Sequence, residues 1–436
     1  MDVESVAILG MGYVGLPTAL GLYANGVRTI GIDISARRLA AIRDGSADLL
    51  DDDRLRLIEA LGDKNFLLTA DTSLVSGAGA VIVCVPTPLD RYLTPDLDPL
   101  RAACASVVEH VVPGQVLVLT STSFVGTTRE LLVEPLLRRG LVPGRDVYVA
   151  FSPERIDPGR PDHLQQRTPR VVGGVTPECT ARARDVLRLI TPIVHPVSSA
   201  EASELTKLYE NSFRAVTLAL ANEFAEISRC FGLDPIEVTH AAGTKPYGFL
   251  VSYPGPGVGG HCIPCDPHYL LWQLRRSRRA APIVEEAMRS IAQRPRQVAE
   301  HAVETLSSAG RGMTGARVLV VGVSYKPGVQ DLRESSALEL IGELGARGAL
   351  VSFHDPLVPT LELPGGRVLE SVRDPRGVDW DLAVIHTIHP GFDYQWAHEC
   401  PVVLDATYRF ARPRHEDPGH RRRRVHRLPP DRAPAG

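Results

Sequence analysis

The sequence predicts an α/β protein in which two doubly wound parallel-sheet domains are joined by a central α-helical region. Short apolar segments alternate with longer amphipathic ones in the first half of the chain, the alternation stops near residue 200, and it resumes after residue 310. Such alternation is typical of parallel sheets that carry helices on both faces. A chain of 436 residues is also too long for one ordinary hydrophobic core, which favours two or three domains.

The first sheet is predicted from five segments that are short, rich in Val and Ile, and bounded by Gly, Pro or Asp. These segments are VAILG at 6–10, TIGID at 29–33, AVIVCVP at 80–86, VLVLTST at 116–122 and VYVAFSP at 147–153. Amphipathic stretches between them supply the helices. We place this first domain at residues 1–198.

Residues 199–310 are predicted to form the helical region. The segment 201–232 has no strand pattern, and its apolar residues keep helical spacing up to Gly232, a typical helix stop. A second helical stretch covers 282–310, and we expect Pro295 to interrupt it because proline lacks the amide that a helix interior needs.

Strand–helix alternation returns over residues 311–411, which we assign to a third, Rossmann-like domain. Its strands are predicted at 316–325, 349–356, 382–390 and 402–408. Residues 412–436 are rich in Arg, Pro and His. Such a segment cannot bury enough apolar area to offset its ordering entropy, so we expect a disordered basic tail.

Composition excludes several classes of protein. The chain is 44% hydrophobic and 23% charged, with a formal net charge of -3, so no overall charge draws it to nucleic acid or to a membrane surface. The N-terminus has no basic segment before an apolar one, and no run of about 18 apolar residues predicts a membrane span. Seven scattered cysteines make a disulfide framework improbable and favour a reducing cytoplasm.

Gly10, Gly12 and Gly15 follow the first predicted strand in the spacing G-x-G-x-x-G. Gly10 permits a tight turn, Gly12 lets the backbone approach a pyrophosphate, and Gly15 lets the helix pack on the strand. Asp33 ends the second strand, where a carboxylate accepts hydrogen bonds from the adenosine ribose and disfavours a 2′-phosphate. The first domain is therefore predicted to be Rossmann-like and to bind NAD rather than NADP.

The stretch PGPGVGGHCIPCDPHY at 254–269 sets Cys262 and Cys265 three residues apart. A structural zinc site would need a second such pair, which the chain lacks, and a thioredoxin-type redox pair would open a helix early in its domain. Both interpretations stay open, but we favour a third. In this one the glycines bring the backbone close to a ligand, Cys262 is a nucleophile and Cys265 is incidental, with no metal bound.

Lys207 and Asn211 stand four residues apart in the predicted helix, so both project from one face. Their neighbours are apolar, and a buried lysine and amide need partners or a task. Both groups are suitable donors for an oxyanion that develops on a substrate oxygen. The alternative is an ordinary solvated helix face.

Six motifs together resemble the nucleotide-sugar 6-dehydrogenases of the UDP-glucose/GDP-mannose dehydrogenase family. They occur in the order typical of the family over roughly residues 1–410, and their sequences are closest to the UDP-N-acetyl-D-glucosamine 6-dehydrogenase branch. The motifs are GMGYVGLP, STSFVGTT, FSPERIDPG, ELTKLYENSFRA, GTKPYGFLVSYPGPGVGGHCIPCDP and SYKPGVQDLRESSALEL. The resemblance implies a four-electron oxidation of the sugar C6 alcohol to a carboxylate by two NAD+, with a UDP-sugar as substrate. It further implies a homodimer or higher homo-oligomer built on the central region, and a nucleotide-binding C-terminal domain.

The resemblance also implies roles for individual residues. Cys262 would form a thiohemiacetal and then a thioester, Lys207 and Asn211 would stabilise the oxyanions, and Asp266 would help to activate water. Thr122 and Glu154 would hold a catalytic water and handle protons. Cofactor contacts are implied for Gly10, Gly12, Tyr13, Val14, Gly15, Asp33, Pro86, Thr87, Thr122 and Arg333. Substrate contacts are implied for Glu154, Arg155, Lys207, Asn211, Lys245, Tyr253, Gly259 and Lys326.

Two departures weaken an assignment to the UDP-glucose enzymes. Those enzymes commonly carry a lysine where Cys265 stands, and a second acid a few residues after Glu154, where this chain has Asp157 and Pro158. A UDP-glucose 6-dehydrogenase nevertheless stays an alternative. So does a one-step 3-hydroxyacid-type dehydrogenase, which would need neither Cys262 nor a third domain, and so does a catalytically silent NAD-binding regulator.

Overall fold

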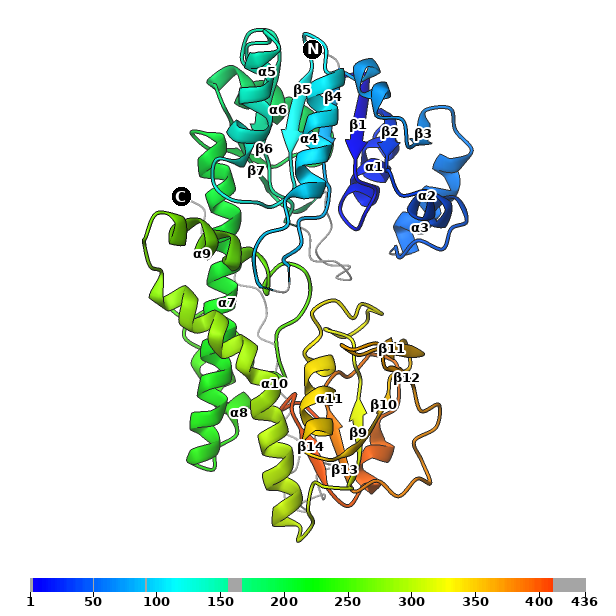
Figure 1. The fold of residues 1–436 in the computed structure, drawn as a ribbon, viewed down its shortest axis with the longest axis vertical. Helices are drawn as coiled ribbons and strands as arrows, with labels where there is room; N and C mark the ends of the chain where they lie inside the picture. The colour runs from blue at the N-terminus through cyan, green and yellow to red at the C-terminus, as the bar shows by residue number, and fades with distance from the viewer. Residues whose placement is uncertain (1–2, 50, 91, 156–166, 411–436) are drawn as a thin grey trace, which may run out of the picture.

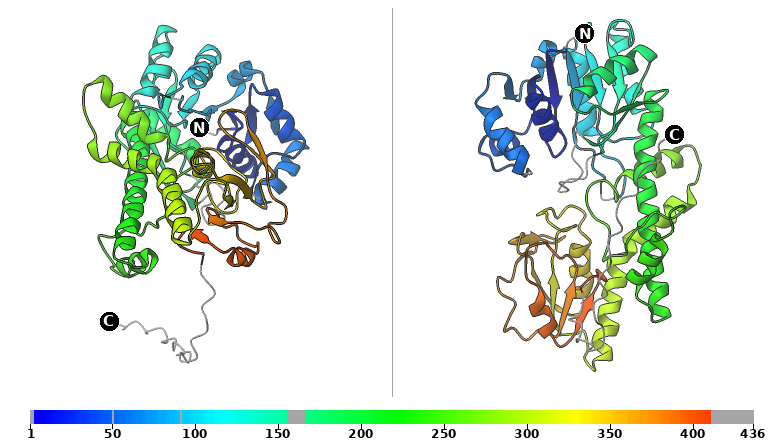
Figure 2. Two further views of the ribbon diagram at one scale, coloured as in Figure 1. Left: turned by 60° about the horizontal axis from the view of Figure 1, so that its bottom comes forward. Right: turned by 180° about the vertical axis from the view of Figure 1, so that it is seen from behind.

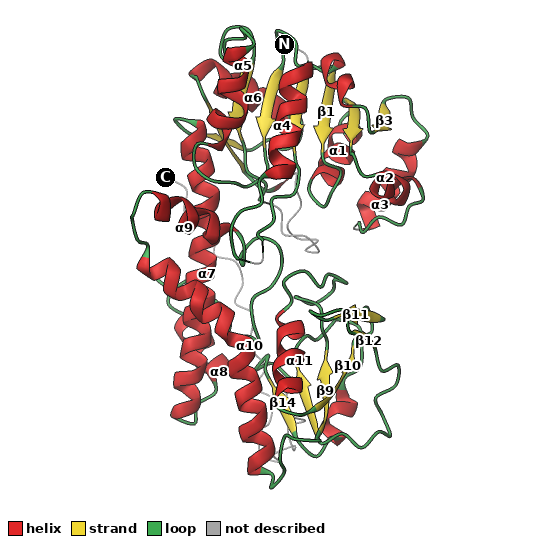
Figure 3. Ribbon diagram, in the orientation of Figure 1, coloured by secondary structure: helices red, strands yellow, loops and turns green. Residues whose placement is uncertain are grey.

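The computed structural model describes residues 3–49, 51–90, 92–155 and 167–410. Within these residues, an N-terminal and a C-terminal α/β unit lie at opposite ends of an elongated molecule, and long helices run along one side of both (Figure 1). Colouring by secondary structure separates the two sheets from these helices (Figure 3). The predicted α/β fold class is confirmed. The tail expected at 412–436 lies outside the described residues.

The N-terminal sheet has eight strands in the order β3-β2-β1-β4-β5-β6-β7-β8, and all neighbours are parallel except β6 and β7. Its strands are β1 (Ser5–Leu9), β2 (Arg28–Ile32), β3 (Phe66–Thr69), β4 (Ala80–Val83), β5 (Val116–Leu119), β6 (Tyr148–Phe151), β7 (Arg170–Gly174) and β8 (Val194–Pro196). The five predicted strands are the central ones, whose almost completely buried Val and Ile residues made them recognisable. The edge strands β3 and β8, and β7 next to β8, were not predicted.

Helices cover both faces of this sheet, which produces two hydrophobic clusters, one on each face. The helical elements are α1 (Gly15–Ala24), α2 (Ala36–Arg43), α3 (Asp51–Leu61), α4 (Asp98–His110), α5 (Glu134–Arg138) and α6 (Pro177–Arg188), with a π-helical turn at Arg129–Val133 and a 3₁₀ helix at Thr72–Gly77. Residues of β1 alternate between the clusters: Ala7 and Leu9 belong to one, and Val6 and Ile8 to the other. Burial on both faces explains why these strands read as continuous apolar runs.

The central region contains α7 (Ala200–Cys230), α8 (Pro235–Gly243), α9 (Asp266–Arg276) and α10 (Pro282–Ser308). The interruption predicted at Pro295 is wrong, because α10 runs through it and Pro295 is buried inside the helix. The first half of α10 packs on α7 and α9 through small and apolar side chains, which include Ala215, Met288 and Ile291. This tertiary packing outweighs the backbone hydrogen bond that proline cannot make.

The C-terminal sheet is parallel, as predicted, and its strand order is β10-β9-β13-β14. Its elements are β9 (Arg317–Val321), α11 (Ser336–Ala346), β10 (Leu350–His354), β13 (Leu382–Ile385), a 3₁₀ helix (Gln395–Glu399) and β14 (Val403–Asp405), beside an antiparallel pair of β11 (Thr360–Glu362) and β12 (Val368–Glu370). The second half of α10 joins α11 in the core of this unit, through residues such as Val298 and Leu306.

Helix α10 thereby connects the helical region to the C-terminal sheet, and α7 lies beside the N-terminal sheet (Figure 2). The strand arrows of the two sheets point toward each other (Figure 1). The carboxyl edges of both sheets therefore face the middle of the molecule, which is where open parallel sheets bind their ligands. No helix in the described ranges is both long and apolar enough to cross a membrane.

Candidate active site

The glycine-rich turn after β1 has the geometry that its spacing predicts. Gly10 has φ +90, and its N–H donates to the Ile32 carbonyl oxygen at 2.8 Å. A Cβ on Gly15 would lie 1.8 Å from the Gly10 oxygen, so only glycine fits where α1 packs on the turn. A Cβ on Gly12 would meet nothing within 4 Å, so this position is open toward the space before the helix N-terminus. The residues present therefore fit a dinucleotide pyrophosphate.

Asp33 fixes this turn from the end of β2. Its carboxylate accepts the Met11 N–H at 2.9 Å and the Ser35 N–H at 2.8 Å, and the Arg38 Nε donates to the Met11 oxygen at 2.6 Å. The Arg38 side chain is therefore hydrogen-bonded to the backbone of the glycine-rich turn. The predicted cofactor residues Tyr13 and Val14 lie in the turn just before α1.

Other predicted residues follow parallel strands and so share one edge of the sheet. Pro86 and Thr87 follow β4, Thr122 follows β5 and Glu154 follows β6. The Tyr269 hydroxyl from α9 donates to the Thr87 oxygen at 3.0 Å, which ties the central helices to this edge.

Lys207, on α7, contacts the carboxyl edge of the N-terminal sheet. Its side chain is buried, and its Nζ donates to the main-chain oxygen of Glu154 at 2.7 Å. One turn further along α7, the Asn211 amide donates to the Asp266 carboxylate. The spacing prediction of one shared face is confirmed, and the alternative of a solvated face is wrong for Lys207.

Asp266 is the first residue of α9 and is 3% exposed. Burial raises the pKa of its carboxyl to about 6, and the Lys207 charge and the Asn211 hydrogen bond offset part of that rise. A carboxyl of this kind is ready to exchange a proton near neutral pH. The site therefore holds a carboxyl group of raised pKa beside an ammonium and an amide, both of which carry N–H donors.

The two cysteines differ in environment. Cys262 is exposed, whereas Cys265 is buried, and burial raises the pKa of the Cys265 thiol to about 12. The main-chain oxygen of Cys262 accepts the Asp266 N–H at 2.8 Å, so the backbone of Cys262 is fixed to the start of α9, next to the buried Asp266. Both cysteines are free thiols, and the described part of the chain contains no group of three or more His, Cys, Asp or Glu side chains arranged to hold a metal ion.

The glycines before Cys262 pack against the C-terminal unit. A Cβ on Gly257 would lie 2.3 Å from the Ser336 side chain, and one on Gly259 would lie 2.5 Å from the Glu334 oxygen. The Gly260 N–H donates to the Arg333 oxygen at 3.0 Å. The sequence predicted a close approach to a ligand, but the approach seen is to this protein segment.

Arg333 reaches the cofactor turn across the molecule. Its guanidinium lies 4.2 Å from the centre of the Tyr13 ring and pairs with Asp331 at 2.6 Å. Two residues predicted to contact the cofactor thus meet from opposite units. Lys326, in the same segment as Arg333, has its Nζ 5.5 Å from the centre of the Tyr325 ring.

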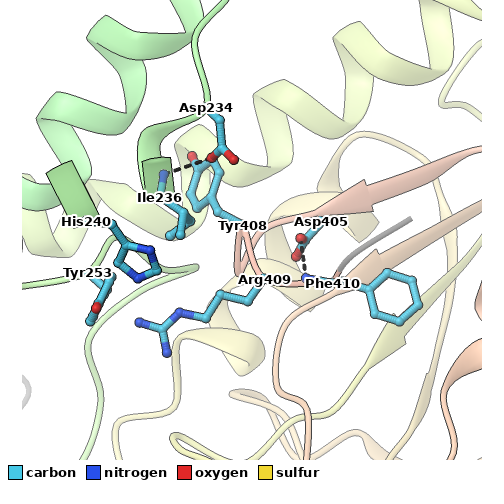
Figure 4. Close-up of a pocket in the computed structure, with 8 residues that line it drawn as sticks. All are labelled: Asp234, Ile236, His240, Tyr253, Asp405, Tyr408, Arg409 and Phe410. Atoms are coloured by element: carbon cyan, nitrogen blue, oxygen red, sulfur yellow. Dashed lines mark hydrogen bonds between the residues drawn. The ribbon is translucent and has the colours of Figure 1, made fainter. Parts of the chain in front are cut away.

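Tyr253 and Lys245 have other surroundings. Tyr253 lines a pocket of about 730 Å³ together with His240, Tyr408 and Arg409, between the start of α8 and the end of β14 (Figure 4). The Arg409 guanidinium lies 4.2 Å from the centre of the Tyr253 ring. Lys245 is exposed on the loop after α8, and its Nζ lies 5.0 Å from the Tyr247 ring.

Sequence reasoning missed several charged partners. The Arg170 guanidinium pairs with the buried Glu154 carboxylate, and the Arg155 guanidinium pairs with Glu210. Glu210 lies between Lys207 and Asn211 in the sequence, but nothing local shows that Arg155 approaches it, because the contact spans 55 residues. Arg294, buried in α10, was missed for the same reason.

Known proteins resemble the chain over nearly all of its length. Residues 4–191, 201–291 and 319–411 match the NAD binding, central and UDP binding domains of the UDP-glucose/GDP-mannose dehydrogenase family. A UDP-N-acetyl-D-mannosamine dehydrogenase of Pyrococcus horikoshii is 33% identical over 392 residues, which cover 89% of this chain and 90% of that protein. A UDP-N-acetyl-D-glucosamine 6-dehydrogenase of Pseudomonas aeruginosa is 32% identical, covering 89% and 91%. The solved structure of a UDP-D-ManNAc dehydrogenase from Pyrococcus horikoshii superimposes with a TM-score of 0.84 at 30% identity, covering 92% of this chain and 95% of that one.

Proposed function

The chain belongs to the UDP-glucose/GDP-mannose dehydrogenase family and is an NAD-dependent nucleotide-sugar dehydrogenase, and from this premise we propose its substrate and chemistry. The substrate is a UDP-N-acetylhexosamine of the N-acetylglucosamine type, and the product is its C6 carboxylate. The observation that carries the chemistry is the buried Asp266, which accepts a hydrogen bond from Asn211, feels the charge of Lys207 and follows the exposed Cys262 by four residues.

When bound, NAD+ would supply the hydride acceptor for each of the two oxidations. The Gly10–Gly15 turn would hold its pyrophosphate, and Asp33 would accept hydrogen bonds from its ribose. Over the whole reaction one alcohol, two NAD+ and one water give one carboxylate, two NADH and three protons. The second oxidation needs a nucleophile, because an aldehyde carbonyl has no second hydride to lose until something adds to it.

Cys262 supplies that nucleophile. Its sulfur adds to the aldehyde carbon and forms a thiohemiacetal, which loses its remaining C–H hydrogen as hydride and becomes a thioester. A thiol has an ordinary pKa of about 8.5, and a nearby cation such as Lys207 favours the reactive thiolate. The covalent link also retains the aldehyde between the two oxidations.

Lys207 and Asn211 stabilise the negative oxygen of each intermediate. Buried donors of this kind are worth more than the same donors in water, because they are already oriented when charge develops. Asp266 then takes a proton from the water that hydrolyses the thioester, with the carbon–sulfur bond breaking and the thiolate leaving. Thr122 and Glu154 hold the catalytic water and handle protons, and Arg170 pairs with the Glu154 carboxylate.

The domain limits predicted from the sequence, 1–198, 199–310 and 311–411, are part of the same proposal. The C-terminal unit and the loop before Cys262 hold the nucleotide part of the substrate. The pocket that Tyr253, Tyr408 and Arg409 line has the aromatic and cationic groups that suit a pyrimidine ring and its phosphates. Lys326, Gly259 and Lys245 are assigned to the same substrate.

We further infer that the working enzyme is a homodimer in the cytoplasm. Helix α7 exposes a stripe of large apolar side chains on the side away from Lys207. Its members are Tyr209, Phe213, Leu220, Phe224, Ile227 and Phe231, which are 38% to 75% exposed. A stripe of this size is unfavourable in water, and a second copy of α7 would cover it.

The test is the stoichiometry of the purified enzyme with UDP-N-acetylglucosamine, UDP-N-acetylmannosamine and UDP-glucose. We expect two NADH for each N-acetylhexosamine consumed and no free aldehyde. One NADH with an accumulating aldehyde would overturn the thioester route and favour a one-step dehydrogenase. Turnover of UDP-glucose alone would overturn the proposed sugar.

A further inference from the structure

Arg294 is an arginine that the proposed chemistry does not use, although it is 1% exposed in the middle of α10. The guanidinium is always charged and carries five N–H donors. Burying such a group is costly unless acceptors surround it. The groups that the Arg294 guanidinium contacts should therefore explain why it is buried.

The guanidinium binds three separate parts of the chain. Its Nε donates to the main-chain oxygen of Gly255 at 3.0 Å, and its Nη1 donates to the Glu226 carboxylate of α7 at 2.6 Å. Its Nη2 donates to the Tyr408 hydroxyl at 2.7 Å, just beyond β14. One side chain thus joins α7, the loop before Cys262 and the C-terminal unit.

Gly255 is held from both sides. Its N–H donates to the Asn222 side chain of α7 at 2.9 Å, and its carbonyl accepts from Arg294 of α10. Gly255 lies two residues after Tyr253 and seven before Cys262. The clamp therefore fixes the loop at a point between the pocket wall and the exposed thiol.

The other end of the guanidinium holds the opposite wall of that pocket. Tyr408 lines the pocket together with Tyr253 and Arg409 (Figure 4). It also lines a smaller cavity of about 100 Å³ with Arg294 itself. Arg294 therefore contacts one residue of the pocket wall, Tyr408, and the loop at Gly255 at the same time.

We propose that Arg294 is a positioning residue that sets the register between the substrate pocket and the Cys262 loop. A nucleotide seated in the pocket that Tyr253, Tyr408 and Arg409 line then delivers its sugar to the thiol at a fixed distance. The proposal rests on the proposed function, because it assumes that one substrate spans the pocket and Cys262. Glu226, which also contacts the His301 Nε2 at 3.0 Å, balances the buried charge.

The experiment compares Arg294→Met, Arg294→Lys and Tyr408→Phe with the wild-type enzyme, by steady-state kinetics on a UDP-N-acetylhexosamine and, separately, on NAD+. For Arg294→Met we expect kcat/KM for the sugar nucleotide to fall by at least about tenfold, partly through KM, while KM for NAD+ stays within about twofold. Arg294→Lys should restore only part of the loss, because an ammonium cannot reproduce the planar fork. Tyr408→Phe keeps the ring and removes one acceptor, so it should give a smaller rise in the same KM.

A purely structural role predicts a different pattern. It would lower kcat in proportion to the folded fraction and leave both KM values unchanged, and this result would overturn the proposal. Arg296→Met is the matched control, because Arg296 is exposed on the same helix and pairs only with Glu300 among the described residues. If Arg294→Met does not fold, Arg294→Lys and Tyr408→Phe decide the question.

A second readout follows the thiol itself. The rate at which iodoacetamide alkylates Cys262, measured by peptide mass spectrometry with and without UDP, should change on UDP binding in the wild type and change less in Tyr408→Phe. An identical response in both would overturn the proposal. Failure of the proposed function is distinguishable, because the wild type itself would then leave UDP-N-acetylhexosamines unoxidised or release one NADH with free aldehyde.

Discussion

The Asn211 amide donates a hydrogen bond to the buried carboxylate of Asp266, and burial raises the pKa of that carboxyl to about 6. The hydrogen bond favours the ionised form and burial favours the neutral form. Asp266 therefore titrates within the range in which an enzyme of this kind is assayed.

We expect turnover to show an acid limb near pH 6, falling about tenfold per pH unit below it, because Asp266 must be ionised to take a proton from water. Asn211→Ala removes a group that lowers this pKa, so the limb should move to higher pH in addition to any loss of kcat. The measurement is kcat against pH for both enzymes. If the acid limb lies at the same pH in the wild type and in Asn211→Ala, ionisation of Asp266 does not cause it.

The same shift predicts how stability depends on pH. The folded pKa lies above the ordinary value of 3.8, so the folded state binds more protons between about pH 4 and pH 6. Stability should fall as pH rises through this window, by on the order of 3 kcal/mol at most. Asp266→Asn should abolish this contribution in urea titrations at several pH values. A variant with an unchanged pH dependence would show that another group is responsible.

Cys262→Ser should abolish production of the carboxylate, because a hydroxyl is a far weaker nucleophile than a thiolate. Cys265→Ala is the matched control, since the Cys265 thiol is buried and its pKa is raised to about 12. This control should retain kcat within about threefold, with a modest loss of stability from the missing sulfur. The assay counts NADH per sugar. If the Cys265 variant loses both activity and bound zinc, the interpretation of this pair as a zinc site would be supported.

Gly259→Ala should disrupt the loop, because the new Cβ would lie 2.5 Å from the Glu334 oxygen and 2.7 Å from the Tyr325 Cβ. We expect a fall in kcat/KM of at least about tenfold, since misplacing a reacting group costs rate steeply. Gly255→Ala is the control in the same loop, as its Cβ would meet nothing within 4 Å. Equal kinetic losses in the two variants would show that the contact with the C-terminal unit is unimportant.

Gly12→Ala and Gly15→Ala should separate cofactor binding from folding. A Cβ on Gly12 has free space, so Gly12→Ala should keep its melting temperature and raise KM for NAD+ by about tenfold or more. A Cβ on Gly15 would lie 1.8 Å from the Gly10 oxygen, so Gly15→Ala should lower the melting temperature as well. Thermal melts and NAD+ titrations test both. An unchanged KM for NAD+ in Gly12→Ala would place the pyrophosphate elsewhere.

Phe224→Asp should break the proposed dimer, because Phe224 is 50% exposed in the middle of the α7 stripe. A charge in a face that pairs with its own copy is repelled by its symmetry mate. Ile283→Asp on α10 is the control, being 71% exposed outside this stripe. Sedimentation velocity should give a monomer for the first variant and the wild-type state for the second.

Much of the fold could be predicted because its signals are local. The strands at 6–10 and 80–86 are apolar throughout because both faces of the sheet are covered, and the Gly10–Gly15 spacing specifies its turn by itself. The course of α10 through Pro295 could not be predicted, because packing against α7 decides it. The shared face of Lys207 and Asn211 follows from helix geometry alone.

The rest of the site depends on contacts between distant segments. The pairing of Arg170 with Glu154, and of Arg294 with Gly255 and Tyr408, leaves no local pattern in the sequence. The glycines of the Cys262 loop were recognised as positions of close approach. Their neighbour, the segment 325–336, could be identified only once the chain was folded.

The segment 325–336 is synthesised after the Cys262 loop that packs against it. The loop of Cys262 fits against residues translated more than 60 positions after it, at Tyr325, Glu334 and Ser336. A ribosome product that stops before β9 would already hold the cofactor turn and the thiol, yet it would lack the surface that seats the thiol. If the proposed mechanism holds, we expect interrupted synthesis to yield an inactive fragment and not a partial dehydrogenase that releases aldehyde.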